Sequence, residues 1–123
     1  MDQRQILRGT TLYFGAPASP MSAERAARIT DAVTQISGIA EAHLPQCLIG
    51  GDVSPRQVLV IGVASQPDIP RIIRELEQRL NGALPDGDYI DILPFTIPKL
   101  FPGVREARCQ IFPVTNKPWW KLW

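Results

Sequence analysis

The chain has 123 residues, close to the commonest size of a single domain, and at this length folding buries roughly two-thirds of the surface of the unfolded chain. A hydrophobic content of 45% and a charged content of 20% are ordinary for a globular protein and exclude a disordered or fibrous chain. The net charge is +1, and the basic residues are scattered among acidic ones. Because no stripe of Lys and Arg can follow a phosphate backbone, nucleic acid is not expected as a partner.

No window of the sequence approaches the roughly 18 apolar residues that a membrane span needs, and the opening MDQRQILRG carries no apolar signal segment. We therefore expect no membrane span and a cytoplasmic location. Cys47 and Cys109 are too few and too far apart for a disulfide framework, so two reduced thiols are predicted, although a single bridge stays open.

The first half of the chain predicts a strand, a helix and a second strand. Thr10–Phe14 is a short β-branched and aromatic run that ends at a glycine and two prolines. Ser22 is a suitable N-cap for an amphipathic helix over Ala23–Ile36, whose apolar residues recur every three or four positions. Ile39–Ile49 alternates like a strand. Pro45 cannot donate to a ladder, so this strand is predicted to lie at a sheet edge or to be broken near its middle.

The segment from Gln57 to Phe95 has the clearest pattern. Gln57–Ala64 is apolar on both faces, which is typical of a strand in the middle of a sheet. Asp68 is the predicted N-cap of a second amphipathic helix, which Asn81 and Gly82 are expected to end. Asp88–Leu93 is the predicted fourth strand, ended by Pro94. The apolar stripe of the second helix consists of Ile69, Ile72, Ile73, Leu76 and Leu80.

The order βαββαβ predicts an α+β domain with a ferredoxin-like layer, a four-stranded sheet with both helices on one face. We expect one domain over residues 1–123, with a core at about 9–95 and a proline- and tryptophan-rich extension at 96–123. A short helix is favoured for Gly103–Ile111. The alternation of Ala107, Cys109 and Ile111 leaves a strand open there.

Four stretches carry a family resemblance: GTTLYFGAPASP, AEAHLPQCLI, QVLVIGVASQPDIPRIIRELEQRL and LPDGDYIDILPF. Together they resemble the C-terminal domain of the enhanced serine sensitivity protein SseB, over roughly residues 9–95. The resemblance rests on turns and strand ends and not on catalytic residues, and it implies no known reaction. It also implies that similar stand-alone domains act as immunity or accessory proteins in bacterial toxin and secretion loci.

Few side chains suggest chemistry. His43 and Cys47 are four residues apart on one strand, but zinc normally needs two further ligands, so we predict no metal and an isolated histidine at the surface or partly buried. Asp86, Asp88 and Asp91 form a carboxylate group that could bind a cation or a small ligand, although aspartate is also common in turns. There is no GxSxG and no phosphate loop, so no catalytic residue and no cofactor are predicted.

The strongest feature outside the scaffold is the cluster Trp119, Trp120 and Trp123, because tryptophan is enriched in interface hot spots. These indoles are expected to pack on their own domain, to contact a partner or a second copy, or to touch a membrane surface.

The favoured hypothesis is a non-enzymatic protein-binding module that uses its uncovered sheet face or this aromatic end. The partner-binding residues of this hypothesis are the three tryptophans with Asp86, Asp88 and Asp91. The alternatives are a small-ligand sensor or enzyme at those aspartates, with His43, and a homodimer.

Overall fold

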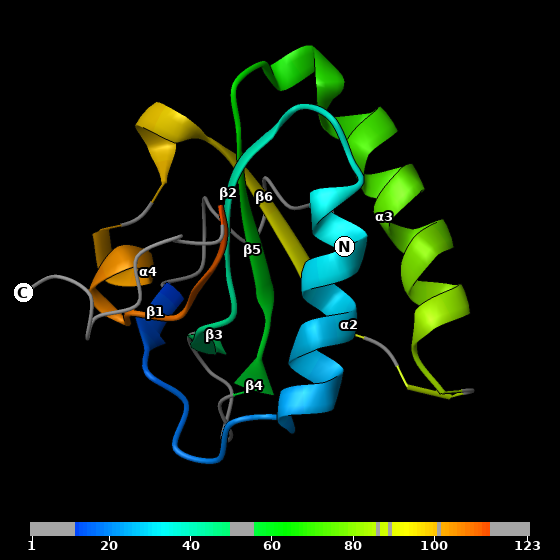
Figure 1. Ribbon diagram of the computed structural model, residues 1–123. Coiled ribbons are helices and arrows are strands. Elements are labelled where there is room, and N and C mark those ends of the chain that lie inside the picture. The colour runs from blue at the N-terminus through cyan, green and yellow to red at the C-terminus, as the bar shows by residue number, and fades with distance from the viewer. Residues whose placement is uncertain (1–11, 50–55, 86, 89, 101, 114–123) are drawn as a thin grey trace, which may run out of the picture.

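The computed structural model describes residues 12–49, 56–85, 87–88, 90–100 and 102–113. Its class is α+β, as predicted, with two long helices side by side and a short helix on the other side of the strands (Figure 1). The elements in chain order are β1 (Leu12–Gly15), α2 (Ala23–Thr34), β2 (Ile39–His43), β3 (Gln46–Ile49), β4 (Arg56–Gln57), β5 (Leu59–Val63), η1 (Gln66–Asp68), α3 (Ile69–Ala83), β6 (Ile92–Thr96), η2 (Ile97–Lys99), α4 (Pro102–Glu106) and β7 (Gln110–Phe112). None of the helices in these ranges is long and apolar enough to cross a membrane.

The strands form two sheets, and the predicted ferredoxin-like layout is not confirmed. One sheet has the order β1-β3-β4 and the other β6-β5-β2-β7. A split βαβ unit separates the two strands that a helix joins, whereas β5 and β6, which α3 joins, are parallel neighbours. The first strand, β1, pairs with β3 and does not enter the four-stranded sheet.

The two sheets separate where the predicted second strand is broken. Leu44 and Pro45 divide it into β2 and β3, which confirms one of the two alternatives for a strand containing proline. Backbone and side-chain bonds close the break: Val58 N donates to Pro45 O at 3.0 Å, and Gln57 Nε2 donates to Leu44 O at 2.8 Å. The backbone groups at the junction are therefore satisfied although the ladder is interrupted.

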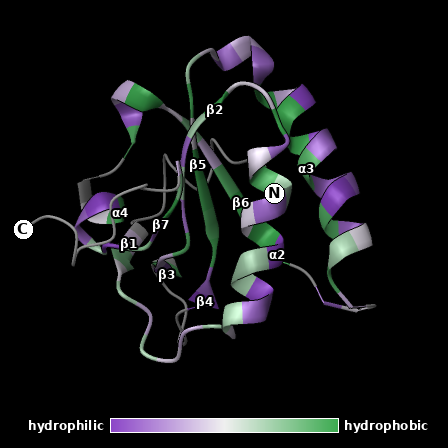
Figure 2. Cartoon of the chain, in the orientation of Figure 1, coloured by the Kyte–Doolittle hydropathy of each residue, from purple (hydrophilic) through white to green (hydrophobic). Residues whose placement is uncertain are grey.

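Both long helices cover the same face of the four-stranded sheet. Ser22 caps α2 as predicted, accepting a hydrogen bond from Arg25 N at 3.2 Å. Asp68 precedes α3 without a side-chain capping bond. In Figure 2 the hydrophobic colour is concentrated on the central strand β5. The buried residues of this helix-side core come from α2, α3, β2 and β5 and from the segments next to them: Ile29, Ala32, Val33, Ile36, Ile39, Ala42, Leu44, Leu59, Ile61, Val63, Ile72, Leu76, Leu80, Leu84 and Ile90.

The opposite face of the sheet is covered, contrary to the expectation of an uncovered face. A second cluster combines strand residues with the C-terminal segment around α4, and Phe14 of β1 packs against it. Its buried members are Cys47, Val58, Val60, Phe95, Leu100 and Val104. β5 contributes to both clusters, which confirms that it is the doubly covered central strand.

The predicted end of the second long helix and both predicted ends of the fourth strand were wrong. The helix α3 continues through Gly82 to Ala83, so Asn81 and Gly82 do not end it. The fourth strand starts at Ile92 and contains Pro94 instead of ending there. Leu59 N donates to Asp91 O, so Asp91 and every second residue after it direct their backbone groups toward β5. Pro94 belongs to the other set, whose backbone groups point away from β5. Its missing N–H therefore costs no hydrogen bond of the ladder.

Residues 102–112 contain a helix and a strand in succession. The predicted helix over Gly103–Ile111 is shorter, because α4 ends at Glu106 and Gln110–Phe112 pairs with β2 as β7. Arg108 has a φ of 56°. A residue in the left-handed region just after a helix reverses the chain direction, which allows the following segment to join the sheet.

Candidate functional site

A groove of about 520 Å³ lies between α3 and the edge strand β6, and we call it the edge groove. The α3 residues that line it recur every four positions, so they share one face of the helix. Ile92 and Pro94 alternate along β6 and therefore share one face of the strand. The lining residues are Ile69, Ile73, Glu77, Asn81, Ile90, Asp91, Ile92 and Pro94.

The edge groove has an apolar floor that water can reach. Ile69, Ile73 and Ile92 are each only half-buried, although all three pack against the helix-side core. Within the described residues, β6 pairs with β5 alone. Exposed apolar surface next to a sheet edge is a common feature of binding surfaces for other polypeptides.

The rim of the edge groove is acidic. Asp91 Oδ2 lies 3.0 Å from Arg56 Nε, and since the two side chains are 39% and 55% exposed, water weakens this ion pair. Glu77 is exposed, and among the described residues no cation lies within ion-pair distance of it. The groove therefore presents negative charge beside apolar surface.

Asp88 belongs to a different part of the surface. Its two carboxylate oxygens accept hydrogen bonds from Arg25 Nε at 2.9 Å and Arg25 Nη2 at 3.0 Å, a two-pronged pair that joins it to α2. Asp91 instead pairs with Arg56 of β4, so the two carboxylates have separate arginine partners. Asp86, Trp119, Trp120 and Trp123 lie outside the described residues.

His43 is buried, with 1% of its surface exposed, so the prediction of a surface or partly buried histidine was wrong. Side chains alternate between the two faces of β2, so His43 and Glu41 point to the same face, the one on which α4 lies. His43 Nε2 lies 2.7 Å from Glu41 Oε1, and Glu41 accepts two bonds from Arg105, at 3.0 Å from Nε and 2.9 Å from Nη2. His43 Nδ1 is buried and has no hydrogen-bond partner among the described residues.

The hydrogen bonds from Arg105 hold the pKa of Glu41 below its ordinary value, although burial of the carboxylate opposes this effect and His43 adds to the lowering. The same bonds raise the pKa of Arg105. The Arg105–Glu41–His43 chain thus links α4 to the sheet.

The cysteines do not complete a metal site. Cys47 is buried and Cys109 is half-buried, and the two are not joined by a disulfide. Burial raises the pKa of the Cys109 thiol, which reduces the fraction of reactive thiolate at neutral pH. In the described part of the chain, no three His, Cys, Asp or Glu residues gather so that they could hold a metal ion.

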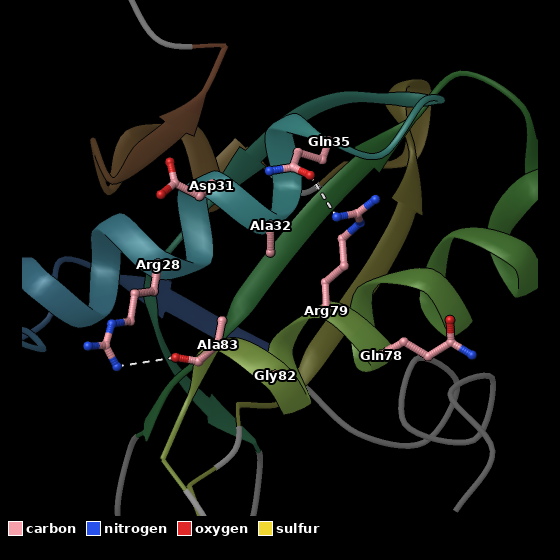
Figure 3. A pocket seen from close by; sticks show the side chains of 8 residues that line it. All are labelled: Arg28, Asp31, Ala32, Gln35, Gln78, Arg79, Gly82 and Ala83. Atoms are coloured by element: carbon pink, nitrogen blue, oxygen red, sulfur yellow. Dashed lines mark hydrogen bonds between the residues drawn. The ribbon is translucent and has the colours of Figure 1, made fainter.

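A second groove, of about 380 Å³, follows the contact between α2 and α3 (Figure 3). Its arginines already join the two helices: Arg28 Nη1 donates to Ala83 O at 3.2 Å, and Arg79 Nη1 donates to Gln35 Oε1 at 2.7 Å. Figure 3 shows both side chains extended toward these partners. This groove is therefore a packing seam, and the edge groove is the stronger candidate for binding.

Comparisons with protein-family models, with curated proteins and with solved structures find no match to this chain. The resemblance to the SseB C-terminal domain therefore stays a prediction. The periodicity of α3 could have identified Ile69, Ile73 and Glu77 as one helix face. Their position beside β6 could not be predicted, because β6 was placed four residues too early.

Proposed function

We propose that this chain is a non-enzymatic protein-binding module that receives a segment of a partner protein in the edge groove. The segment would carry apolar side chains and at least one Lys or Arg. The observation that supports this proposal is the combination of half-buried isoleucines with an acidic rim beside a sheet edge.

The apolar part of the groove would supply most of the affinity, because removing isoleucine surface from water contributes roughly 25 cal/mol per Å². The charged rim would orient the bound segment of the partner. Glu77 has no cation close to it among the described residues, and Asp91 shares its charge with an exposed arginine, so a basic side chain of the partner would find favourable positions at both.

The resemblance to the SseB C-terminal domain supports the same class of function, and with it we propose the role of an immunity or accessory protein. The partner would then be a cognate toxin. Asp91 lies at the rim of the edge groove and also in the LPDGDYIDILPF stretch on which the resemblance rests.

The alternative of a small-ligand sensor or enzyme at the aspartates and His43 has less support. A shared carboxylate site needs its members close together, and Asp88 and Asp91 pair with arginines of different elements. His43, which this alternative adds to the aspartates, is buried and bound to Glu41.

The test is co-elution with the product of the neighbouring gene, followed by calorimetric titration. Ile73→Asp places a charge on the floor of the groove, and Glu77→Arg reverses the charge of its rim. We expect each to weaken binding by about tenfold or more, as for a central interface residue. Glu106→Arg makes the same charge change at an exposed position of α4 and should leave the affinity unchanged.

Two results would contradict the proposal. If the neighbouring gene's product did not bind, the immunity role would be lost. If it bound both groove variants as tightly as it binds the wild-type chain, the partner surface would lie elsewhere on the molecule.

A further inference from the structure

We propose that residues 114–123, the tryptophan segment, bind in the edge groove of their own chain. This inference goes beyond the proposed function, because it needs no partner protein. The segment lies outside the described residues, and its sequence is VTNKPWWKLW.

The chemistry of the tryptophan segment matches that of the edge groove. The segment contains three tryptophans and a leucine, together with Lys117 and Lys121, and it has no acidic residue. The groove offers isoleucine side chains and a rim with Glu77 and Asp91. Apolar groups of the segment would cover the floor, while its lysines would approach the carboxylates.

The segment is also long enough to reach the groove. Phe112 is the last residue of β7, and it pairs with Ala42 of β2. Ala42 also pairs with Ile61 of β5, and Ile61 pairs with Pro94 of the groove. Phe112 and Pro94 thus lie in one row, three strand spacings or about 14 Å apart. Ten extended residues span about 33 Å, which exceeds this separation and leaves length for a path around the end of the sheet.

The direction in which the chain leaves β7 also favours binding in the edge groove. β2 is antiparallel to both β5 and β7, and β5 is parallel to β6, so β7 runs in the same direction as β6. The chain therefore leaves β7 toward the end of the sheet where β5 ends and α3 begins. Ile69, the first residue of α3, lines the groove at this end.

Docking would cover two apolar surfaces that are unfavourable in water. Three tryptophans within five residues are a solubility liability when they are exposed to water, and so is an apolar groove beside a sheet edge.

Intrinsic fluorescence tests the inference, because all three tryptophans of the sequence lie in this segment. In the full wild-type chain we expect emission at short wavelength and weak quenching by acrylamide. With Glu77→Arg, emission should move to longer wavelength and the quenching constant should roughly double, as expected when buried indoles become exposed. Glu77 is exposed, so this variant should fold, and Glu106→Arg is the matched control.

Ile73→Asp should give the same change as Glu77→Arg, with circular dichroism checking that the fold is kept. Wild-type emission should not change on dilution, since the segment and the groove belong to one chain. Emission that is equal in the wild-type chain and in both groove variants would overturn the inference. Emission that depends on concentration would overturn it as well, because it would indicate the segment of a second copy. These readouts need no partner, so they fail or succeed separately from the proposed function.

Discussion

Glu41 is the residue at which β2, β5 and α4 meet. Its carboxylate binds His43 on its own strand and Arg105 of α4, while its Cγ lies so close to β5 that a Cβ at Gly62 would be 2.9 Å away. Only 15% of the Glu41 side chain is exposed. A buried carboxylate is tolerated here because both of its oxygens accept hydrogen bonds from charged or polar donors.

The first prediction concerns the pH dependence of stability. Because the folded protein lowers the pKa of Glu41 below the ordinary 4.5, the ionised carboxylate stabilises the folded state above that pH. This contribution is lost as the pH falls from 4.5 through the lower pKa of the folded state. Urea unfolding should therefore show Glu41→Gln less stable than the wild-type chain at pH 7 and equally stable below the folded pKa.

Glu106→Gln is the control, since Glu106 is exposed on the same helix as Arg105. It should follow the wild-type curve at every pH. A constant difference between Glu41→Gln and the wild-type chain from pH 7 to pH 3 would show that the charge of Glu41 does not contribute.

At the level of the elements, the turn that follows α4 contains Arg108, a residue with positive φ. Ala107 N donates to Gly103 O and Arg108 N donates to Arg105 O, both at 3.1 Å. Arg108 has a φ of 56°, a conformation that costs a side chain such as arginine about 1 kcal/mol relative to glycine. The sequence has no glycine here to indicate the turn, which is why the predicted helix extended to Ile111.

The second prediction follows from this geometry. Arg108→Gly should stabilise the protein by about 0.5–1 kcal/mol, because glycine adopts positive φ without strain. Arg74→Gly, at an exposed position inside α3, should destabilise it by about 1 kcal/mol. Urea unfolding midpoints measure both changes. If Arg108→Gly were destabilising, the turn after α4 would depend on the arginine side chain.

At the scale of the whole molecule, the two hydrophobic clusters are joined through one strand. Leu59, Ile61 and Val63 face α2 and α3, whereas Val58 and Val60 face the α4 side. A change on either side therefore acts on the same central strand. We expect the two clusters to unfold together, although the C-terminal segment around α4 lies outside the predicted core at about 9–95.

The third prediction tests this coupling with one truncation in each cluster. Val33 and Val104 are both fully buried, and Val→Ala at either position should cost about 2 kcal/mol. Each variant should unfold in one transition that circular dichroism and hydrogen exchange report at the same urea concentration. A separate early transition in Val104→Ala would show that α4 and its neighbours unfold independently of the helix-side core.

Elements with a local pattern could be predicted from the sequence. Ser22 and the apolar spacing after it identified α2, the stripe through Leu76 identified α3, and the doubly apolar run identified β5. These features follow from interactions between residues a few positions apart, so they can be read from a short window. The class α+β follows from their order.

The tertiary structure alone decided the rest. Glu41 and Arg105 are 64 residues apart, and no local pattern indicates that they meet. His43 is buried in the folded chain, which no local pattern indicates. β6 is the last strand in the order of its sheet, where a strand can contain proline, and α3 lies beside it, so the edge groove forms between them. Such features arise from contacts between distant segments, and these become fixed only when the strands pair and the helices pack.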